Sequence, residues 1–219
     1  MDVVAALKGS KFDAVPVYTG RYGLGSKDTT PAQIVAVYHN DAKAKFTIGI
    51  NDDVTHLSLE ANEPLVTTPE GTINCKFWGL GADGTVGANK NSIKIIGDHT
   101  DKYAQAYFDY DSKKSGGVTI SHLRFGDKPI RSPYYINQAD FVACHNPSYV
   151  TKGFKMVQDV KPGGVFMINC QWSDEELAHH LNAEAKKYIA DNNIQLYTIN
   201  AIDKAIEIGM GKRTNTILQ

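Results

Sequence analysis

The densest group of residues suited to chemistry is a glycine-rich segment at 79–90, GLGADGTVGANK. Gly79, Gly81 and Gly84 follow the spacing G-x-G-x-x-G, with an apolar strand-like run before them and a helical pattern through Ile93 after them. Glycines at this spacing allow a tight turn, and the free N–H groups at the start of the following helix attract phosphate. The segment therefore predicts a site for an anionic ligand, with a purely structural strand-to-helix turn as the alternative.

The strand expected at 104–110 leads directly into further polar residues. Asp109 or Asp111 can accept a hydrogen bond from a ribose hydroxyl, as acidic residues do in NAD sites. Lys113 and Lys114 follow immediately and point instead to a phosphorylated ribose. Such a ribose occurs in NADP and in coenzyme A, which the spacing does not separate. A solvated turn is the structural alternative for the two lysines.

Three further side chains are candidates for ligand or domain contacts. Arg124 is expected on a loop between strands, where it binds a phosphate, contacts another domain or carries an idle surface charge. Arg213 follows the last expected helix and reaches the same ligand if neighbouring loops converge on one crevice. His145 follows a strand, but no nucleophile or carboxylate stands at a motif spacing from it. We therefore interpret His145 as a structural or interface histidine rather than a catalytic base.

Metal ligation by this chain is not expected. The three cysteines, Cys75, Cys144 and Cys170, form no C-x-x-C pair, which argues against a zinc or iron–sulfur site. Cys75 and Cys170 lie in apolar runs and are expected to be buried. His179 and His180 fit a solvated helix face without a third ligand at helical spacing. We predict neither a catalytic residue nor a metal ligand in this chain.

Short apolar runs that alternate with helical patterns place these candidates on an α/β fold from about Thr72 onward. The five expected strands are 73–79, 104–110, 140–145, 164–170 and 194–199. One expected helix follows the glycine-rich segment, and another follows the turn at 146–148 and runs to about 160. Two more run from 173 to about 192 and from 202 to 208. The pattern predicts a Rossmann-like, doubly wound, mostly parallel sheet.

The first 70 residues contain no complete βαβ unit. Strand-like runs at 34–38 and 46–50 stand between Gly- and Asp-rich turns, so we expect an irregular N-terminal extension that packs on a neighbour. The 219-residue chain has 42% hydrophobic and 21% charged residues, typical of a soluble protein, and its net charge of −1 disfavours nucleic acid and membrane surfaces. Without a signal peptide or an apolar run of about 20 residues, a cytoplasmic location is expected.

Six segments together resemble the pyruvate:ferredoxin (flavodoxin) oxidoreductases, and the resemblance covers nearly the whole chain. These segments are 21–31, 52–59, 77–91, 121–126, 129–134 and 143–147. The resemblance implies that residues 1–64 are the tail of a preceding domain with a linker, and that residues 65–219 are the γ-type domain, which binds coenzyme A. It implies a fragment of an enzyme that oxidatively decarboxylates pyruvate to acetyl-CoA and passes electrons to ferredoxin or flavodoxin.

The same resemblance implies what the rest of such an enzyme supplies. Thiamine diphosphate, magnesium and 4Fe–4S clusters are expected only on absent domains, because neither a Gly-Asp-Gly thiamine signature nor a cysteine-rich cluster motif occurs here. The expected partners are the other domains of the parent enzyme, which is itself expected to be a homodimer. The isolated chain is expected to be inactive.

For this chain, the resemblance implies a coenzyme A site centred on the glycine-rich segment. The residues carried over are Gly81, Asp83, Gly84, Thr85 and Asn89. The N–H groups of Gly84 and Thr85, with the Thr85 hydroxyl, are expected to bind phosphate oxygens, and Lys114 to neutralise the ribose phosphate. Two alternatives stay open: an NAD(P)-binding Rossmann dehydrogenase domain, and a structural spacer without a ligand.

Overall fold

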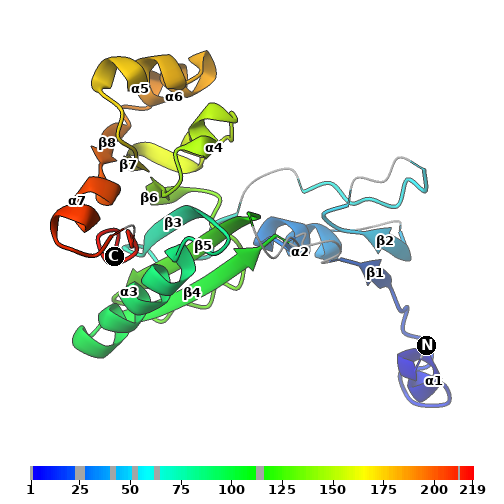
Figure 1. Ribbon diagram of the computed structural model, residues 1–219. Coiled ribbons are helices and arrows are strands. Elements are labelled where there is room, and N and C mark those ends of the chain that lie inside the picture. Colours follow the sequence, from blue (N-terminus) through cyan, green and yellow to red (C-terminus); the bar gives the residue numbers. More distant parts are fainter. Residues whose placement is uncertain are drawn as a thin grey trace. The chain divides into compact units, whose positions relative to one another are not determined.

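The computed structural model describes residues 2–22, 28–39, 43–50, 54–61, 65–111, 116–211 and 213–219. The chain divides into two compact units, Met1–Thr67 and Thr68–Gln219, and each is described by itself. The second unit contains the glycine-rich segment and is built around one sheet (Figure 1).

A six-stranded sheet in the order β4-β5-β3-β6-β7-β8 forms the second unit. The strands are β3 (Ile73–Leu80), β4 (Tyr103–Tyr110), β5 (Val118–Gly126), β6 (Ala139–Cys144), β7 (Val160–Asn169) and β8 (Gln195–Ile199). β3, β6, β7 and β8 run parallel, whereas β5 runs antiparallel to both β3 and β4. The predicted α/β fold with a mostly parallel sheet is confirmed.

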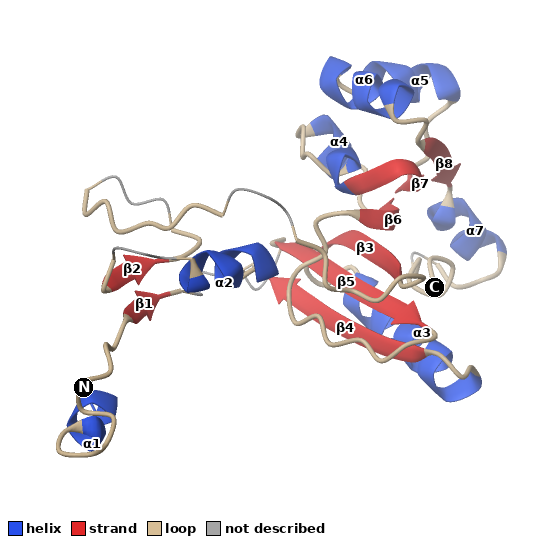
Figure 2. Cartoon of the chain, turned by 180° about the vertical axis from the view of Figure 1, so that it is seen from behind, coloured by secondary structure: helices blue, strands red, loops and turns tan. Residues whose placement is uncertain are grey.

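Helices cover the two faces of this sheet over different strands (Figure 2). The helices are α3 (Thr85–His99), α4 (Ser148–Thr151), the 3-10 helix η1 (Val157–Asp159), α5 (Asp174–His180), α6 (Ala183–Asp191) and α7 (Ala201–Glu207). Val142 and Phe166 share the face that packs against Tyr149 and Leu177 in the main hydrophobic core. α3 contacts β3, β4 and β5 on the opposite face, where the Lys90 ammonium lies 5.4 Å from the centre of the Phe108 ring.

Three expected elements differ from the structure. Residues 118–126 form β5 instead of a loop, because their buried polar side chains hide the apolar alternation that marks a strand. The helix expected between the turn at 146–148 and about residue 160 is much shorter, because α4 ends at Thr151 and Gly153 follows with a φ of +72°. The helix expected from 173 to 192 is interrupted at Asn182, whose Oδ1 accepts the Ala185 N–H at 2.7 Å and starts α6.

The first unit has little core of its own. It contains α1 (Asp2–Leu7), β1 (Thr19–Arg21), α2 (Pro31–Tyr38) and β2 (Lys45–Thr47), with β1 and β2 paired in parallel. The strand predicted at 34–38 is wrong, because Thr30 and Gln33 form a reciprocal capping box that starts α2. Among its described residues, only Phe46, Thr47 and Ile48 are buried.

Candidate functional site

The turn between β3 and α3 requires glycine at two positions. Gly84 immediately precedes α3 with a φ of +90°, a conformation that residues with a side chain rarely adopt. A Cβ at Gly79 would collide with the side chain of Thr85. The Gly81 N–H donates to the Gly117 carbonyl at 2.7 Å and ties the turn to the residue before β5. The glycine spacing therefore encodes a tight strand-to-helix turn, called the glycine turn below (residues 79–85).

Asp83 stabilises the glycine turn from within. Its Oδ2 accepts the Leu80 N–H at 2.7 Å, and its Oδ1 accepts the Thr85 N–H at 2.8 Å. Thr85 is 3% exposed, and its Oγ1 lies 3.0 Å from Nδ1 of His145. We expected the Thr85 N–H and hydroxyl to bind phosphate, but the structure pairs both of them inside the protein.

The first turn of α3 instead presents donors one residue further along. Within the described residues, the backbone N–H groups of Val86 and Gly87 have no hydrogen-bond acceptor, and Gly84 has no side chain with which to cap the helix. Val86 and Gly87 line a cavity of about 450 Å³ together with Gly81, Asp83 and Gly84. This first cavity has the size of a small-molecule site and adjoins the positive end of the helix dipole.

The end of β4 contributes another wall of the first cavity. Asp111 lines it beside Tyr110, whereas Asp109 is not among the lining residues. Of the two acidic residues that the sequence left as candidates, Asp111 is therefore the one at the cavity. Lys113 and Lys114 lie outside the described residues, so the predicted ribose-phosphate contact of Lys114 stays a prediction.

Arg124 does not lie on a loop, and that prediction is wrong. It belongs to β5, is 3% exposed, and stands opposite Asn74, six residues before the end of β3. Asn74 is five residues before Gly79, so at about 3.3 Å per residue it lies about 17 Å along the strand from the start of the glycine turn. Its Nη1 donates to the Ser132 carbonyl at 3.0 Å and to Oε1 of Gln105 at 3.2 Å. These contacts hold the segment after β5 against the sheet.

Asn89 and Arg213 line neither of the two cavities described for this unit. Asn89 is on α3 and is 1% exposed, so the helix buries it. Arg213 is exposed, and its N–H donates to the Met210 carbonyl at 3.3 Å. The structure therefore brings Gly81, Asp83 and Gly84 to one cavity and leaves these two residues away from it.

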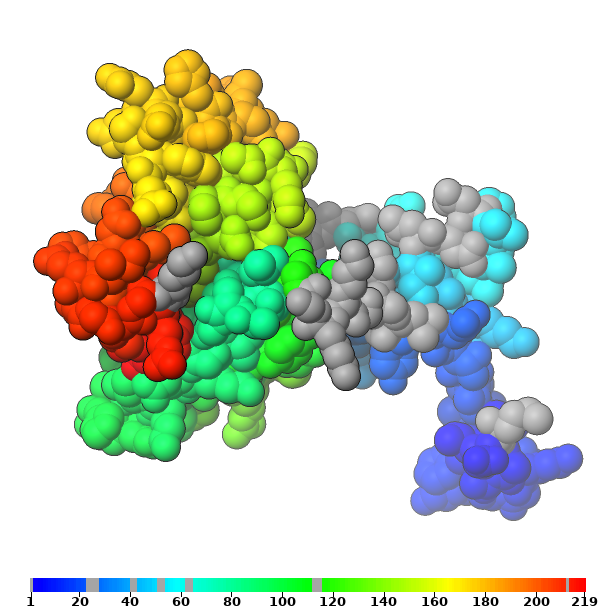
Figure 3. Space-filling model, in the orientation of Figure 1, coloured from blue at the N-terminus to red at the C-terminus, as the bar shows by residue number. Residues whose placement is uncertain are grey.

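A second cavity, of about 440 Å³, shares Ala82 and Asp83 with the first. Its other lining residues include Thr85, His145, Asn169, Thr214, Asn215 and Leu218. The C-terminal segment lies beside the start of α3 (Figure 3), and a Cβ at Gly84 would stand 3.0 Å from the Cβ of Asn215. Sequence reasoning missed Asn169 and the C-terminal residues, because no motif marks them.

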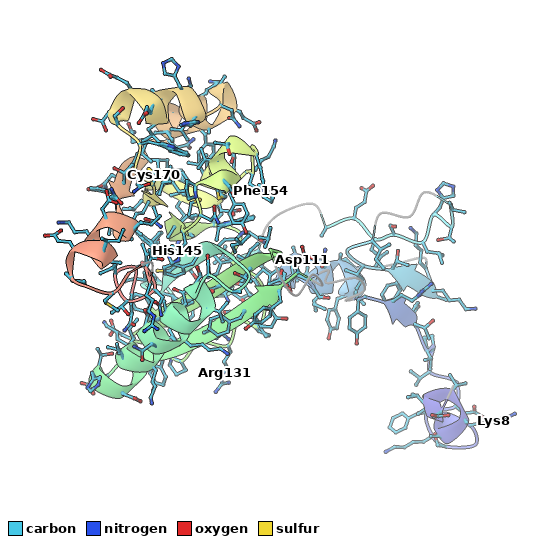
Figure 4. The ribbon with its side chains drawn as sticks, viewed as in Figure 1. Lys8, Asp111, Arg131, His145, Phe154 and Cys170 are labelled. Carbon is cyan, nitrogen blue, oxygen red and sulfur yellow. The ribbon has the colours of Figure 1, made fainter. Side chains whose placement is uncertain are left out.

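His145 follows β6 and is fixed by its backbone as well as by its ring (Figure 4). Its N–H donates to the Trp78 carbonyl at 2.8 Å, and its carbonyl accepts the Asn169 Nδ2 at 3.0 Å. Burial lowers the pKa of His145 to about 4, although the nearby Asp83 carboxylate acts in the opposite direction. The imidazole is therefore neutral at pH 7.

The cysteines are free and buried, as expected for Cys75 and Cys170. Burial raises the pKa of Cys75 and of Cys144 to about 12, so neither is a thiolate at neutral pH. Over the described ranges, no group of three or more His, Cys, Asp or Glu residues is arranged to hold a metal ion. No helix in the described part of the chain combines the length and apolar character needed to cross a membrane.

The chain is similar to proteins of one family. The family model described as "Pyruvate ferredoxin/flavodoxin oxidoreductase" matches residues 74–219. The pyruvate:ferredoxin oxidoreductase of Moorella thermoacetica is 59% identical over 207 residues, which cover 93% of this chain and 18% of that protein. The chain thus spans less than a fifth of the length of this curated relative.

Two solved structures have a similar fold. The pyruvate oxidoreductase subunit PORC of Thermotoga maritima has a TM-score of 0.53 at 16% identity, over 67% of this chain and 72% of that one. A 2-oxoglutarate:ferredoxin oxidoreductase of Magnetococcus marinus, with 2-oxoglutarate, coenzyme A and succinyl-CoA bound, has a TM-score of 0.51 at 14% identity, over 68% of this chain and 23% of that one. At these identities the two structures establish the fold alone.

Proposed function

Because the chain belongs to the pyruvate ferredoxin/flavodoxin oxidoreductase family, we propose that it is the γ-type domain of an enzyme that converts pyruvate to acetyl-CoA. We further propose that its first cavity binds the nucleotide end of coenzyme A (CoA). Residues 1–64 would then be the tail of the preceding domain with its linker, and residues 65–219 the CoA-binding domain.

The observation that carries this proposal is the pair of free N–H groups at the start of α3. Val86 and Gly87 both line the first cavity, and the helix dipole adds positive potential at the same point. Gly87 has no side chain, so an oxygen of a diphosphate can approach the backbone closely. Asp83 takes no part in phosphate binding, because its two oxygens already accept the Leu80 and Thr85 N–H groups.

The other groups around the cavity suit the rest of a nucleotide. Asp111 is a hydrogen-bond acceptor for a ribose hydroxyl or an adenine amino group, and its charge disfavours phosphate beside it. Lys114, three residues further along the chain, is proposed to neutralise the ribose phosphate. A CoA-bound oxidoreductase of similar fold supports the choice of CoA among phosphorylated nucleotides.

The remaining chemistry is proposed to reside outside this chain. The chain matches only 18% of its Moorella relative, and its described residues contain no cluster of metal-ligating side chains. Thiamine diphosphate, magnesium and iron–sulfur clusters would belong to other domains, which would pass electrons to ferredoxin or flavodoxin. The chain by itself is expected to bind CoA without oxidising pyruvate.

Isothermal titration calorimetry with CoA and with 3′,5′-ADP tests the site. The variant Gly87→Leu places a side chain where the first cavity lies open, since a Cβ at Gly87 meets nothing within 4 Å. Both ligands should bind this variant at least about tenfold more weakly, a loss of about 1.4 kcal/mol. Gly97→Leu is the matched control, because Gly97 lies on the same helix with equally open space and does not line the cavity.

The control variant should bind like the wild type. Unchanged CoA affinity in Gly87→Leu would reject the proposed site. Binding of NADPH but not CoA would favour the alternative of an NAD(P)-binding domain. No binding of any of these ligands would favour a structural spacer.

A further inference from the structure

Strand β4 forms one edge of the six-stranded sheet (Figure 2). Its ladder with β5 runs without a register shift from Tyr103 to Tyr110. Just beyond this ladder, the Asp111 N–H donates to the Val118 carbonyl at 3.0 Å, so the odd-numbered residues of β4 are the ones that bond to β5. The backbone N–H and C=O groups of the even-numbered residues therefore point outward from the sheet. These four outward residues are Ala104, Ala106, Phe108 and Tyr110.

The outer edge of β4 lacks the features that normally prevent a strand from pairing. No described residue of the second unit bonds to its outward backbone groups. Edge strands of native proteins are usually very short or carry lysine, proline or a bulge. β4 has eight residues and contains neither lysine nor proline, and Asp109 is its one charged residue. Three of its tyrosines are at least 50% exposed, namely Tyr103, Tyr107 and Tyr110. The edge of β4 is therefore suited to pair with a further strand.

The sequence of β4 is complementary to itself in one antiparallel register. Within β4, only a register centred on Tyr107 pairs all four outward residues with outward residues of an identical strand. It aligns Ala104 with Tyr110 and Ala106 with Phe108, so each small side chain stands opposite a large one. Cross-strand pairs of this kind stabilise a sheet through contact on one face. This register also satisfies every outward N–H and C=O group of both strands.

The opposite face of β4 fits the same register. Tyr107 meets Tyr107 of the identical strand, and Gln105 meets Asp109. Oε1 of Gln105 already accepts Arg124 Nη1 at 3.2 Å, so the Gln105 amide N–H groups are the donors for the Asp109 carboxylate. A register centred on Gln105 would instead place Asp109 opposite Asp101, and like charges directly opposite each other are destabilising. The side chains on both faces thus select the register centred on Tyr107.

We propose that β4 pairs in antiparallel fashion with β4 of a second copy of this chain, about a two-fold axis at Tyr107. Pairing of this kind uses the same surface on both copies and closes after two, so it covers both exposed edges. Tyr103 of the second copy then stands opposite Asp111, which lines the first cavity. The second copy therefore reaches the wall of that cavity. The inference goes beyond the proposed CoA site and does not depend on it.

Sedimentation velocity of the 219-residue chain at rising concentration measures the association. Each copy contributes one eight-residue strand, fewer than the roughly 20–30 residues a side of a standard interface, so we expect a weak, concentration-dependent dimer. Tyr107→Lys removes the aromatic pair and places two ammonium groups opposite each other, which should raise the dissociation constant about tenfold. Tyr197→Lys is the matched control and should not change it. Tyr197 is 54% exposed on the opposite edge strand β8, against 53% for Tyr107.

Cysteine substitutions test the register. In Tyr107→Cys the two thiols face each other at a pair without hydrogen bonds, where the Cα atoms of opposite residues are about 4.5 Å apart, so mild oxidation should give a covalent dimer. Tyr103→Cys is the matched control, because Tyr103 is similarly exposed on the same strand. Its two copies lie about 26 Å apart in this register, at about 3.3 Å per residue, and should not cross-link. The native cysteines are buried and leave the added thiol as the accessible one.

A chain that stays monomeric at every concentration would overturn the inference. A dimer that Tyr107→Lys does not weaken, or that Tyr197→Lys weakens equally, would also overturn it, because another surface would then hold the two copies together. Thermal melts check that Tyr107→Lys folds, and the cross-linking of Tyr107→Cys decides the question if it does not. A covalent dimer of Tyr103→Cys but not of Tyr107→Cys would reject this register and the inference with it.

Discussion

The two sides of β3 are stabilised by different kinds of contact. On the side of β6 and β7, Val142 and Phe166 belong to one apolar core beneath α4, η1 and α5. On the side of β5 and β4, the buried residues include Ser121, His122 and Arg124. On the first side the neighbouring strands pair in parallel. On the second side they pair in antiparallel fashion, and the sheet ends at the edge strand β4.

This difference indicates separate roles for the two sides in supporting the glycine turn. Burial of apolar surface is non-directional and supplies most of the stability, so it dominates beside β6 and β7. Hydrogen bonds of buried polar groups are directional and specify one arrangement. On the polar side, Nδ1 of His122 accepts the Ile136 N–H at 3.1 Å, and Arg124 donates to Ser132. These bonds fix the segment between β5 and β6.

The largest expected effect is the loss of apolar core on the β6–β7 side. Phe166→Ala should lower the free energy of unfolding by about 4 kcal/mol, because Phe166 is buried in the main core and its removal leaves a cavity. Phe108 lies on β4 and is only half-buried, so Phe108→Ala should lower the free energy of unfolding clearly less. Urea unfolding measures both variants, and equal losses would contradict the proposed division between the two sides.

Removal of a polar contact should have the next largest effect. Arg124→Met leaves the Ser132 carbonyl without this charged donor, and we expect a loss of about 2 kcal/mol in the free energy of unfolding. The CoA affinity of the folded variant should be unchanged, because Arg124 lies far along β5 from the glycine turn. Urea unfolding and calorimetric titration measure the two quantities. If Arg124→Met is as stable as the wild type but binds CoA more weakly, Arg124 contacts the ligand and the prediction is wrong.

The same division explains which elements the sequence predicts. The apolar runs of β3, β6 and β7 are recognisable because these inner strands of the sheet carry buried apolar residues. β5 was missed because His122 and Arg124 are buried through hydrogen bonds and not through hydrophobicity. α2 was assigned as a strand because its apolar residues outweighed the capping signal of Thr30 and Gln33.

For the candidate site, the sequence predicted the backbone features but not the pairing of the side chains. The glycine spacing predicts the turn, the start of α3 and an anion site, since each of these depends on residues close together in the chain. It does not predict that Asp83 takes the Thr85 N–H and leaves Val86 and Gly87 as the free donors. The pairing of Thr85 with His145, 60 residues away, depends on the parallel register of β3 and β6.

Mild acid should destabilise the protein through one buried histidine on each side of β3. Burial lowers the pKa of His122 to about 3, helped by the charges of Lys76 and Arg124, and burial lowers the pKa of His145 to about 4. Both are neutral in the folded state, while the unfolded chain takes up protons below its ordinary pKa of about 6.5. The stability that the two neutral histidines contribute is thus fully present above pH 6.5. It is lost as the pH falls towards their pKa values in the folded protein.

Each histidine should contribute about 1 kcal/mol to the loss of stability between pH 6.5 and pH 5.5. His122→Asn keeps an acceptor for the Ile136 N–H but does not titrate, so it should remove about half of this dependence. Urea unfolding at the two pH values measures the difference between variant and wild type. An unchanged pH dependence would mean that His122 is accessible to protons in the folded protein.

The smallest expected effect comes from two glycine-to-alanine substitutions on α3, which should change stability equally but CoA binding differently. Gly87→Ala and Gly97→Ala should each stabilise the folded protein by about 0.8 kcal/mol, because alanine has the higher helix propensity and a Cβ at either position meets nothing within 4 Å. Only Gly87→Ala should weaken CoA binding, since its methyl group enters the first cavity beside the free N–H groups. Thermal unfolding with calorimetric titration measures both properties. Equal CoA affinities in the two variants would mean that the start of α3 is a stable helix end and not a phosphate site.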